Sequence, residues 1–560
     1  MNTKYIVVLG GVISGVGKGV TTASLGKIMK EYGYKVTLIK IDPYINCDAG
    51  TLRPTEHGEV WVTEDGGEID QDLGTYERFL DQDILKKNNI TTGQIYRAVI
   101  DRERRGEYLG KTVQFIPHIV EEIMHRIRVA SDGYEIAIIE IGGTIGDYEN
   151  VPFLYAVKAL ERYASKHDMA YVLVTYLPIP RHMHEMKTKP AQQSIKLCHE
   201  AGIFPDIIIC RAHAPLDTLR REKIEVLAQV QPDAVISSPD VETIYQIPID
   251  LEQEKIGDKM LARLGLSPRA VPCWDEWKDR VHVLTHAQQK LMIAVVGKYC
   301  TSGEYSSADS YVSIEHALVH AAAESGYKIE IKWIDSVMFE KEPSSLKLLD
   351  MYDAILVPGG FGTVGVEGKI EAISYARLHE VPYLGICYGM QLACVEYARH
   401  VAGIPGAHTA EVAPDASDLV IKILDDQKQL VETHLYGGTM KLGAYEVVLS
   451  PHTQVWHLYN EAKKLSLEGT VQERHRHRYE VNPAYIDRLR DKGMVFSGFQ
   501  QRADGTALAE YIELPSHPFF IGMQAHPEFK SRFLNPSPIF KGFIQAALEY
   551  QKNRHADSDE

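Results

Sequence analysis

Short apolar runs rich in β-branched residues alternate along this chain with longer segments of helical periodicity. In the first half, the residues between these runs, such as 20–31 and 151–165, have apolar positions at helical spacing. Strands that alternate with helices favour a mostly parallel sheet covered on both faces. The apolar runs of the first half occupy residues 5–9, 35–39, 135–139, 171–174 and 207–210.

The alternation lapses around residues 265–290, where the chain is polar, charged and Pro-containing, and then it begins again. The second series has predicted strands at 292–296, 329–333, 354–357, 383–386 and 519–523, and predicted helices at 311–324, 390–398 and 539–551. A chain of 560 residues holds two large domains or about three smaller ones. The prediction is an α/β protein with two doubly wound domains. Their predicted limits are 1–268 and 291–552, with a linker at 269–290 (including a short helix at 274–284) and a frayed polar tail at 553–560.

Charge, hydropathy and cysteine content exclude several classes of protein. The net charge of −16 argues against a general nucleic-acid-binding surface, although local basic pockets for phosphate remain possible. The chain has no apolar run near the ~20 residues that cross a bilayer, and the run at 5–9 is too short for a signal peptide. The seven cysteines are dispersed and form no CxxC pair, which favours the reducing cytoplasm.

A Gly-rich loop, GGVISGVGKG at residues 10–19, follows the first predicted strand and opens a helix. Backbone N–H groups of such a loop, together with the helix N-terminus, bind phosphate, and Lys18 can reach the outer phosphates. The loop departs from the usual G-x4-G-K-[ST] pattern, because Gly19 stands where a magnesium-binding hydroxyl is expected. Thr21 or Thr22 is open as a replacement. The alternative is a Gly-rich turn of any doubly wound fold.

Phosphoryl transfer also needs a metal ion, so carboxylates at strand ends are candidates. Glu140 ends the predicted strand at 135–139, which points its side chain toward the edge of the sheet where ligands bind. Asp72 is one of several acids in DGGEIDQD (65–72), and a solvated acidic loop is the alternative for it. Lys40 ends another strand and is either a second phosphate-binding group or an ordinary surface lysine.

The second half contains the pattern of a cysteine nucleophile. GICYG at residues 385–389 follows a strand and precedes a helix, which exposes Cys387 at the helix N-terminus. His526 and Glu528 follow another strand and are spaced as a base and the residue that orients it. The glycines of PGGFG (358–362) offer backbone amides for an oxyanion hole. A buried core cysteine is the alternative for Cys387.

Two further features of the second half have structural explanations. Cys394 lies two helical turns after Cys387 and is better explained as a core residue. The basic run RHRHR at 474–478 is either a solvated loop or a clamp for a carboxylate, and composition does not decide between them.

The ordered set of Gly-rich loop, G-x-C-x-G and His-Pro-Glu closely resembles the CTP synthase family over essentially the whole chain. The resemblance implies a P-loop, dethiobiotin-synthetase-like synthetase domain that phosphorylates the 4-oxygen of UTP with ATP and Mg²⁺. It also implies a class I glutamine amidotransferase domain whose ammonia passes through an internal tunnel and displaces phosphate to give CTP. The most specific stretches are residues 10–18, 40–50 (KIDPYINCDAG), 56–58, 65–73, 141–149, 385–390, 474–481 and 524–529.

The resemblance also implies site residues. Catalysis would use Cys387, His526 and Glu528, and His57 would gate the tunnel. ATP would be bound by Gly15, Val16, Gly17, Lys18, Gly19, Val20, Asp72, Pro239, Asp240 and Val241, and magnesium by Asp72 and Glu140. UTP, or CTP as feedback inhibitor, would contact Ser14, Asp147, Tyr148, Glu149, Lys187, Thr188, Lys189, Pro190, Ala191, Gln192 and Lys223. Glutamine would be held by Gly360, Tyr388, Gly389, Met390, Gln391, Glu411 and Arg478, with Arg478 pairing with its carboxylate.

The family further implies GTP as an allosteric activator and a homotetramer, and it leaves open whether tetramers stack into filaments. No nucleic-acid or membrane partner is expected. The alternatives are another glutamine-dependent P-loop amide ligase, such as a cobyrinic acid amidase-like enzyme, or a nucleotide-sensing assembly protein without catalysis. Intact Lys18, Cys387, His526 and Glu528 argue against the second alternative.

Overall fold

The computed structural model describes the chain as two compact units. The first contains residues 1–49 and 69–281, and the second contains residues 50–68 and 282–560. The last boundary falls within the predicted linker at 269–290. The described residues are 3–11, 13–53, 58–162, 165, 167–180, 182, 185–298, 301–302, 305–306, 308–423, 427, 439–502 and 505–558, without the side chains of 301–309 and 557–558.

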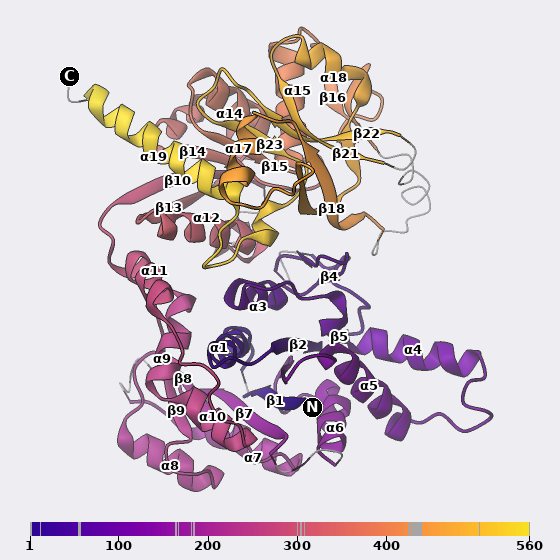
Figure 1. Ribbon diagram of the computed structural model, residues 1–560, viewed down its shortest axis with the longest axis vertical. Helices are drawn as coiled ribbons and strands as arrows, with labels where there is room; N and C mark the ends of the chain where they lie inside the picture. The colour runs from indigo at the N-terminus through magenta and orange to yellow at the C-terminus, as the bar shows by residue number, and fades with distance from the viewer. Residues whose placement is uncertain are drawn as a thin grey trace. The chain divides into compact units, whose positions relative to one another are not determined.

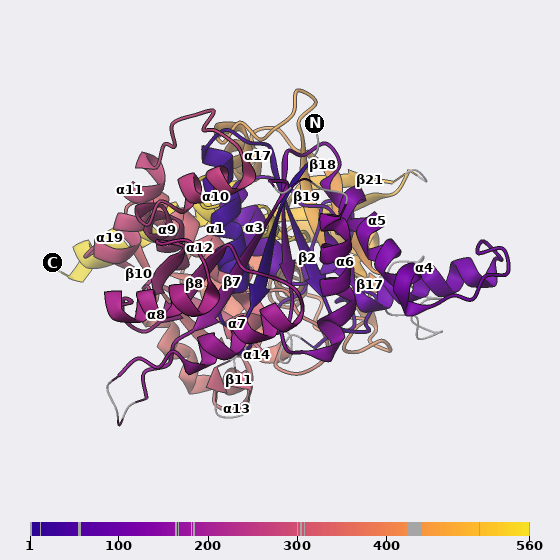
Figure 2. The ribbon, with the colours of Figure 1, turned by 90° about the horizontal axis from the view of Figure 1, so that it is seen from below.

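A seven-stranded, fully parallel sheet forms the centre of the first unit (Figures 1 and 2). Its order is β5 (Asn89–Thr91), β2 (Val36–Asp42), β6 (Ile136–Ile141), β1 (Lys4–Gly10), β7 (Met169–Tyr176), β8 (Ile207–Ala212) and β9 (Val235–Pro239). All strand pairs are parallel, so every strand ends at the same edge of the sheet. The loops that follow these strands therefore meet at one edge, as the alternating sequence pattern predicts.

Helices cover both faces of this sheet. Alternate side chains of β1 point to opposite faces, with Tyr5, Val7 and Leu9 in one apolar core and Ile6 and Val8 buried on the other side. The first core includes α4 (Thr92–Arg104), α5 (Val120–Ser131), α6 (Val151–Glu161), α7 (Lys189–Glu200) and α8 (Thr218–Ala228). The other group packs around α1 (Lys18–Glu31) and consists of α3 (Asp72–Leu80), α9 (Ile247–Gln253) and α10 (Ile256–Leu264).

The predicted linker is helical and partly packed on the first unit. Helix α11 spans Asp275–His286, and its Trp277 is 2% exposed. The indole of Trp277 packs edge-on against Phe79, with ring centroids 5.5 Å apart, and donates a hydrogen bond to Tyr245 O at 2.7 Å. Burial of this aromatic residue explains why the polar composition around it does not produce an extended connection.

The second unit is built on a nine-stranded mixed sheet. Its parallel part is β13 (Lys328–Asp335), β10 (Lys290–Gly297), β14 (Ala354–Val357), β15 (Tyr383–Ile386) and β23 (Phe520–Met523). An antiparallel part continues the sheet with β22 (Ala507–Glu513), β21 (Val495–Gln501), β18 (Lys441–Leu449) and β19 (Thr470–His477). The parallel strands follow the sequence prediction, whereas the antiparallel extension was not predicted.

Helices also cover both faces of the second sheet. One core contains α14 (Val366–Leu378) and α15 (Tyr388–His400), and the other contains α12 (Val312–Glu324), α17 (Gln454–Glu461) and α19 (Pro538–Ser558).

The remaining elements of the chain include α13 (Val337–Lys341), α18 (Pro483–Arg490), β3 (Trp61–Val62), β4 (Glu68–Ile69), β11 (Thr301–Ser302), β12 (Tyr305–Ser306), β16 (Ala407–Thr409), β17 (Asp418–Ile423) and β20 (Tyr479–Val481). Short 3₁₀ or π turns lie at Lys86–Asn88, Phe115–Ile119, Tyr148–Asn150, Ile244–Gln246, Ala308–Tyr311, Pro343–Met351 and Pro527–Lys530.

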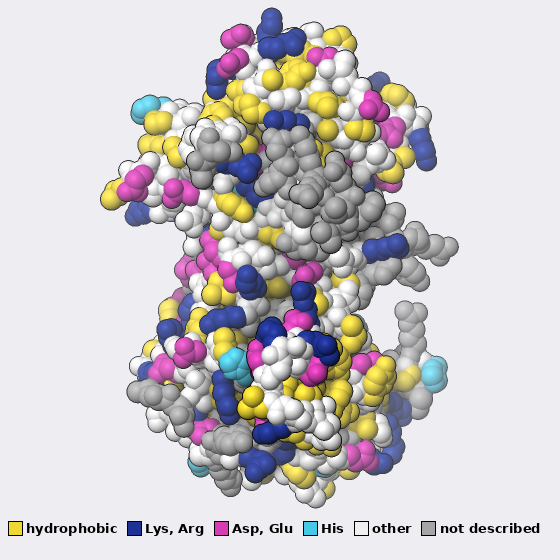
Figure 3. Space-filling model, turned by 90° about the vertical axis from the view of Figure 1, so that its right-hand side faces the viewer, with side chains coloured by type: hydrophobic (Ala, Val, Ile, Leu, Met, Phe, Trp, Pro, Cys, Tyr) yellow, Lys and Arg dark blue, Asp and Glu magenta, His cyan; other side chains and the backbone are white. Residues whose placement is uncertain are grey.

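The C-terminal helix is longer than the sequence analysis predicted. Helix α19 continues to Ser558, so most of the expected frayed tail at 553–560 is helical. Arg554 explains part of this extension, because its guanidinium lies 2.8 Å from the buried carboxylate of Asp353. Among the helices that the structure describes, none is both long and apolar enough to cross a membrane. On the face drawn in Figure 3, acidic and basic side chains are interspersed on each unit.

Residues 50–68 belong to the second unit although they lie early in the sequence. The guanidinium of Arg474 pairs with Glu64 at 2.9 Å, and that of Arg476 pairs with Glu68 at 2.9 Å. Both arginines come from β19, so this strand holds the inserted segment against the second sheet. The placement of residues 50–68 in the second unit was not predicted from the sequence, because it depends on pairing between residues about 400 positions apart.

Candidate active sites

The phosphate loop lies where β1 ends and α1 begins. Gly17 precedes the helix with φ of 89°, a left-handed conformation that favours glycine, and Lys18 is the first helical residue. The Lys18 ammonium donates a hydrogen bond to Gly143 O at 2.7 Å, on the loop after β6. Burial lowers the pKa of Lys18, and the nearby Glu140 carboxylate opposes this effect. The loop therefore presents backbone amides and one cation at the sheet edge, as the sequence predicts.

Four carboxylates surround Lys40 at the same edge of the sheet. The Lys40 ammonium donates to Asp72 Oδ2, lies 3.3 Å from Glu140 Oε1 and lies 3.8 Å from Asp42 Oδ1. Lys40 is only 5% exposed, so the alternative of an ordinary surface lysine is wrong. Asp70 completes the set, since both Asp72 and Asp42 act on its charge.

Burial and mutual repulsion raise the pKa of three of these carboxyl groups, those of Asp42, Asp70 and Glu140. Burial raises the pKa of Glu140 and of Asp42, and burial together with Asp72 and Asp42 raises that of Asp70 to about 7. Lys40 and Lys18 supply two positive charges against four acids, so the carboxyl groups outnumber the cations. Carboxylate oxygens in excess of cations are the donor set that Mg²⁺ prefers, so these residues fit a magnesium ion.

The structure explains why a glycine stands at position 19, where the usual phosphate-loop pattern has a residue with a hydroxyl. A Cβ at Gly19 would collide with Asp72 Oδ1, so only glycine lets this carboxylate lie against the start of α1. The place where a hydroxyl is expected thus faces a carboxylate from α3. Thr22, on the same helix, is fully buried, and its hydroxyl has no hydrogen-bond partner within the described part of the chain.

Arg211, which was not predicted from the sequence, connects the predicted ATP-binding residues Pro239 and Asp240 to the phosphate loop. It is the second-last residue of β8, donates to Pro239 O at 3.0 Å and pairs with Asp240 at 3.2 Å. Its Nε lies 3.5 Å from the position that a Cβ on Gly17 would occupy. A single arginine after the apolar run at 207–210 is the signal that could have identified it.

The predicted pyrimidine-nucleotide residues lie in the segments that follow β1, β6 and β7 and on the helices α7 and α8. Asp147 accepts hydrogen bonds from the Thr144 backbone N–H (2.5 Å) and hydroxyl (2.9 Å), and its charge acts on Lys18. Gln192 donates to the Thr188 hydroxyl at 3.0 Å at the start of α7. The others lie in the phosphate loop (Ser14), after β6 (Tyr148 and Glu149), around the start of α7 (Lys187, Lys189, Pro190 and Ala191) and on the exposed side of α8 (Lys223). Their contacts with a nucleotide stay predictions.

Cys387 lies at a sharp turn between β15 and α15 in the second unit. Its φ of 51° and ψ of −100° are a strained backbone conformation for a residue with a side chain. Its N–H donates to Met523 O at 2.7 Å, which fixes the turn to β23. A Cβ at Gly389 would collide with Val357 O, so the second glycine of GICYG lets the helix pack against β14. This is the nucleophile turn that the sequence predicts.

His526 and Glu528 lie beside Cys387. The imidazole Nδ1 is 2.7 Å from Glu528 Oε1. Burial alone would lower the pKa of His526, but the Glu528 carboxylate and Cys387 outweigh burial and raise it to about 10. The other ring nitrogen, Nε2, is buried and has no hydrogen-bond partner among the residues that the structure describes. A Cβ at Gly359 would lie 3.0 Å from His526 Cε1 and 3.6 Å from Cys387 Cβ, so the predicted oxyanion turn adjoins both residues.

A cavity of about 230 Å³ opens beside this group within the second unit. Cys387, His526 and Glu528 line it together with Gly359, Gly360 and Phe361. Its wall also includes residues from the segment 50–60 and Arg476 of β19. Cys387 is 4% exposed yet borders this space, so it is not an enclosed core residue. His57, the predicted gate of the tunnel, lies outside the described residues.

The predicted glutamine-binding residues are held by internal hydrogen bonds. Gly362 is bonded to two of them, because its N–H donates to Glu411 at 2.6 Å and its O accepts from the Tyr388 hydroxyl at 3.3 Å. Gln391 donates to Tyr479 O at 3.0 Å. Met390 is buried in α15 beside Gly389, and Cys394, further along this helix, is fully buried as predicted. Binding of glutamine by this set stays a prediction.

The basic run at 474–478 is not a solvated loop. Residues up to His477 form the end of β19, and Arg474 is 0% exposed. Arg478 is also buried, and its guanidinium donates to Gln427 Oε1 at 2.5 Å and Thr439 Oγ1 at 2.9 Å. Its role as a carboxylate clamp stays a prediction.

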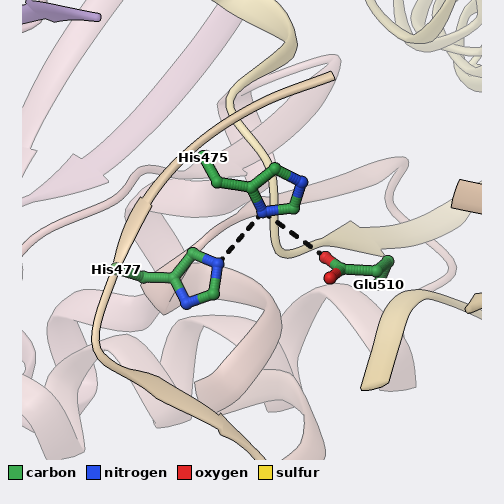
Figure 4. Close-up of side chains that lie close together, drawn as sticks. All are labelled: His475, His477 and Glu510. Carbon is green, nitrogen blue, oxygen red and sulfur yellow. Dashed lines mark hydrogen bonds and ion pairs between the residues drawn. The ribbon is translucent and has the colours of Figure 1, made fainter. Parts of the chain in front are cut away.

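The two histidines of this run form a buried cluster with Glu510 of β22 (Figure 4). Their ligand atoms lie within 4.8 Å of one another, a spacing that a metal ion could use. However, the Lys441 ammonium lies 2.7 Å from Glu510 Oε1, and His475 Nδ1 lies 3.0 Å from His477 Nε2. A buried ammonium repels a metal cation, and the imidazoles already bond to each other. The cluster is therefore a hydrogen-bonded network.

Comparisons with known proteins show which families the two halves of the chain match. Residues 4–266 match the family described as CTP synthase N-terminus, and residues 307–546 match glutamine amidotransferase class-I. A CTP synthase of Thermococcus gammatolerans is 47% identical over 98% of this chain and 99% of its own length. A CTP synthase of Thermus thermophilus is 45% identical over 98% of both chains. A solved structure titled as the CTPS glutaminase domain of Trypanosoma brucei with bound acivicin is 34% identical, over 46% of this chain and 94% of that one, with a TM-score of 0.41. Because curated CTP synthases align with nearly the whole chain, this chain belongs to the CTP synthase family.

Proposed function

We propose that this chain makes CTP by the ATP-dependent amination of UTP, with ammonia that it releases from glutamine. The observation that carries the proposal is the presence of two separate constellations in one chain of this family. One is a phosphate loop beside a carboxylate cluster, and the other is a Cys–His–Glu group beside a cavity. Neither constellation alone accounts for both halves of the amination.

In the glutaminase half, the thiolate of Cys387 attacks the side-chain amide carbon of glutamine. A carbon–sulfur bond forms, the carbon–nitrogen bond breaks, and His526 supplies the proton with which ammonia leaves. Water then hydrolyses the thioester to glutamate and frees the thiol. Glu528 keeps the imidazole oriented, since its carboxylate accepts from Nδ1 at 2.7 Å. The backbone N–H groups of Gly359, Gly360 and Phe361 stabilise the oxyanion of each tetrahedral intermediate.

Glutamine selection is assigned to the residues around this turn. The guanidinium of Arg478 pairs with the substrate α-carboxylate, because a planar fork suits a carboxylate better than an ammonium does. Gly360, Tyr388, Gly389, Met390, Gln391 and Glu411 complete the glutamine-binding set.

In the synthetase half, Lys18 and the loop from Gly15 to Val20 hold the phosphates of ATP. The γ-phosphoryl group moves to the 4-oxygen of the uracil ring, which turns a poor leaving group into a phosphate. Asp72 and Glu140 would hold a magnesium ion, which supplies positive charge for the transferring phosphoryl group when it is bound. Pro239, Asp240 and Val241 contact the adenine, and the loops after β6 and β7, with Lys223, bind the pyrimidine nucleotide.

Ammonia then attacks carbon 4 of the ring, and phosphate leaves to give CTP. Ammonia is mostly protonated in neutral water, and ammonium is not a nucleophile. Transfer through an internal tunnel, with His57 as its gate, keeps ammonia neutral until it reacts. This requirement gives a physical reason for one chain to contain both activities.

We further assign GTP as an activator, CTP as a feedback inhibitor that uses Asp147, Tyr148 and Glu149, and a homotetramer in the cytoplasm as the working form. Family membership supports these assignments. Sedimentation of the purified protein with and without nucleotides tests the tetramer.

The test of the main proposal is a spectrophotometric assay with UTP, ATP, Mg²⁺ and glutamine. A rise in CTP absorbance is expected, and it should also appear when ammonia replaces glutamine. Absence of CTP with either nitrogen source would favour another glutamine-dependent P-loop ligase.

A further inference from the structure

Gln524 lies between β23 and His526, and its side chain contacts the nucleophile. It is 0% exposed. Its amide Nε2 lies 3.5 Å from Cys387 Sγ, within hydrogen-bond range for sulfur, and its backbone N–H donates to Glu510 O at 2.9 Å. In the sequence, Gln524 lies within the stretch 524–529 that resembles the family, and no role was predicted for it.

The orientation of the Gln524 side-chain amide follows from the backbone carbonyl of Tyr479, to which it is linked through the side chain of Gln391. Gln391 Nε2 donates to Tyr479 O at 3.0 Å, and because a carbonyl only accepts, the nitrogen of Gln391 must face it. The same nitrogen donates to Gln524 Oε1 at 3.1 Å. The oxygen of Gln524 thus faces Gln391, and its N–H faces the sulfur of Cys387.

The carbonyl of Tyr479 is held from a second side by the buried histidines in Figure 4. His477 Nδ1 lies 3.2 Å from Tyr479 O and must donate to it, which leaves His477 Nε2 as an acceptor. His475 Nδ1 donates to that Nε2 at 3.0 Å. Lys441 fixes the surroundings, because its ammonium bonds to both Glu510 and Glu480. Hydrogen bonds therefore run without a break from His475 to the sulfur.

We propose that Gln524 is a further catalytic residue, which stabilises the Cys387 thiolate by a hydrogen bond, and that Gln391 and His477 are positioning residues that fix its amide. The proposal rests on the proposed glutaminase activity. Cys387 is 4% exposed, so water contributes little to the solvation of its charge, and the oriented N–H of Gln524 stabilises that charge in addition to the His526 cation. The same N–H stabilises the thiolate that leaves when water hydrolyses the thioester. Gln524 transfers no atom in either step.

The decisive variant is Gln524→Glu, which keeps the shape but places a carboxylate oxygen against the sulfur. A hydrogen bond to a charged group contributes strongly to the stability of that charge. Loss of this bond should therefore lower kcat/KM for glutamine hydrolysis by at least about ten-fold. The rate of Cys387 alkylation by iodoacetamide should fall at pH 7. The midpoint of the pH dependence of that rate should rise by at least about 1 pH unit. A purely structural role would not move that midpoint in protein that remains folded. Ammonia-dependent CTP synthesis should stay within about two-fold of the wild type.

Two further variants and a control separate orientation from general damage. Gln391→Glu removes the donor that faces Tyr479 O and Gln524, so it should shift the alkylation midpoint in the same direction by a smaller amount. Gln524→Met keeps an unbranched side chain without charge and should also lower the alkylation rate, which covers the case that Gln524→Glu does not fold. Gln472→Glu, on the exposed side of β19, should change neither measurement.

The outcomes distinguish this inference from the proposed function. Wild-type protein that releases glutamate from glutamine, together with Gln524→Glu and Gln524→Met variants that alkylate with an unchanged midpoint, would overturn the role of Gln524. Wild-type protein that releases no glutamate while ammonia supports CTP synthesis would overturn the proposed glutaminase itself.

Discussion

The ion pair between His526 and Glu528 should set the alkaline limit of glutamine hydrolysis. The pKa of His526 rises from an ordinary 6.5 to about 10, against the effect of burial. Two unit charges at the observed 2.7 Å attract by about 6 kcal/mol at an effective dielectric constant of about 20. This attraction is large enough to outweigh burial, which alone would lower the pKa, and Cys387 acts in the same direction as Glu528.

Replacement of Glu528 by Gln removes this attraction while it keeps a hydrogen-bond acceptor near Nδ1. We expect the pKa of His526 to fall from about 10 toward its ordinary 6.5, because the largest charge that opposes burial is removed and only Cys387 still opposes it. At a pKa of 6.5 about one thirtieth of the imidazole carries its proton at pH 8, so activity that needs imidazolium should fall by up to about thirty-fold there. The raised pKa stabilises the fold below pH 6.5, and this stabilisation is lost as the pH rises through about 10.

The measurement is kcat/KM for glutamine hydrolysis from pH 6 to 10.5, with ammonia-dependent CTP synthesis as the control for the other unit. The alkaline limb should move from near 10 in the wild type toward 6.5 in the variant. The difference in Tm between the two proteins should be largest near pH 6 and shrink toward pH 10. A variant whose alkaline limb stays near 10 would refute the reasoning.

Three further substitutions test the two constellations separately. Cys387→Ala should abolish CTP synthesis from glutamine and leave synthesis from ammonia intact; unchanged synthesis from glutamine would show that another group is the nucleophile. Lys18→Ala should abolish synthesis from either nitrogen source, and turnover retained with ammonia would contradict the phosphate-loop assignment. Glu140→Gln removes one of the four carboxylates around Lys40, so the Mg²⁺ concentration for half-maximal synthesis should rise at least about ten-fold. An unchanged Mg²⁺ requirement in a titration of ammonia-dependent activity would exclude Glu140 as a ligand.

The parallel parts of both sheets could be predicted because each strand is a local signal. A strand buried on both faces must be an apolar run, and its end must be a turn that satisfies backbone groups at the sheet edge. The phosphate loop and GICYG could be predicted for the same reason, since each is a contiguous stretch that follows such a run.

The antiparallel half of the second sheet escaped prediction because its edge strand carries charge. The run RHRHR has the composition of a solvated loop, yet Arg474 is fully buried against Glu64. Burial of a guanidinium depends on a carboxylate that is distant in sequence, so no local pattern reveals it. The same holds for Gln524, whose role depends on the order of hydrogen bonds through Gln391 rather than on spacing.

The carboxylate cluster could be predicted only in part. Glu140 follows a strand and is a local signal, whereas Asp72 is one acid among several in its loop. The distinguishing contact of Asp72 is with Gly19 and Lys40, on two other elements. Side chains that meet only through tertiary structure are found by geometry or by family resemblance.

The placement of residues 50–68 has a practical consequence for dissecting this protein. The polypeptide passes into the second unit after residue 49, leaves it after 68 and enters it again after 281, so no single scission separates the halves intact. A glutaminase fragment that starts at 282 would lack Glu64, which pairs with the buried guanidinium of Arg474. Loss of this pair should lower the free energy of unfolding of the fragment by about 3–5 kcal/mol. Supplying the missing stretch as a grafted or added peptide should recover that loss.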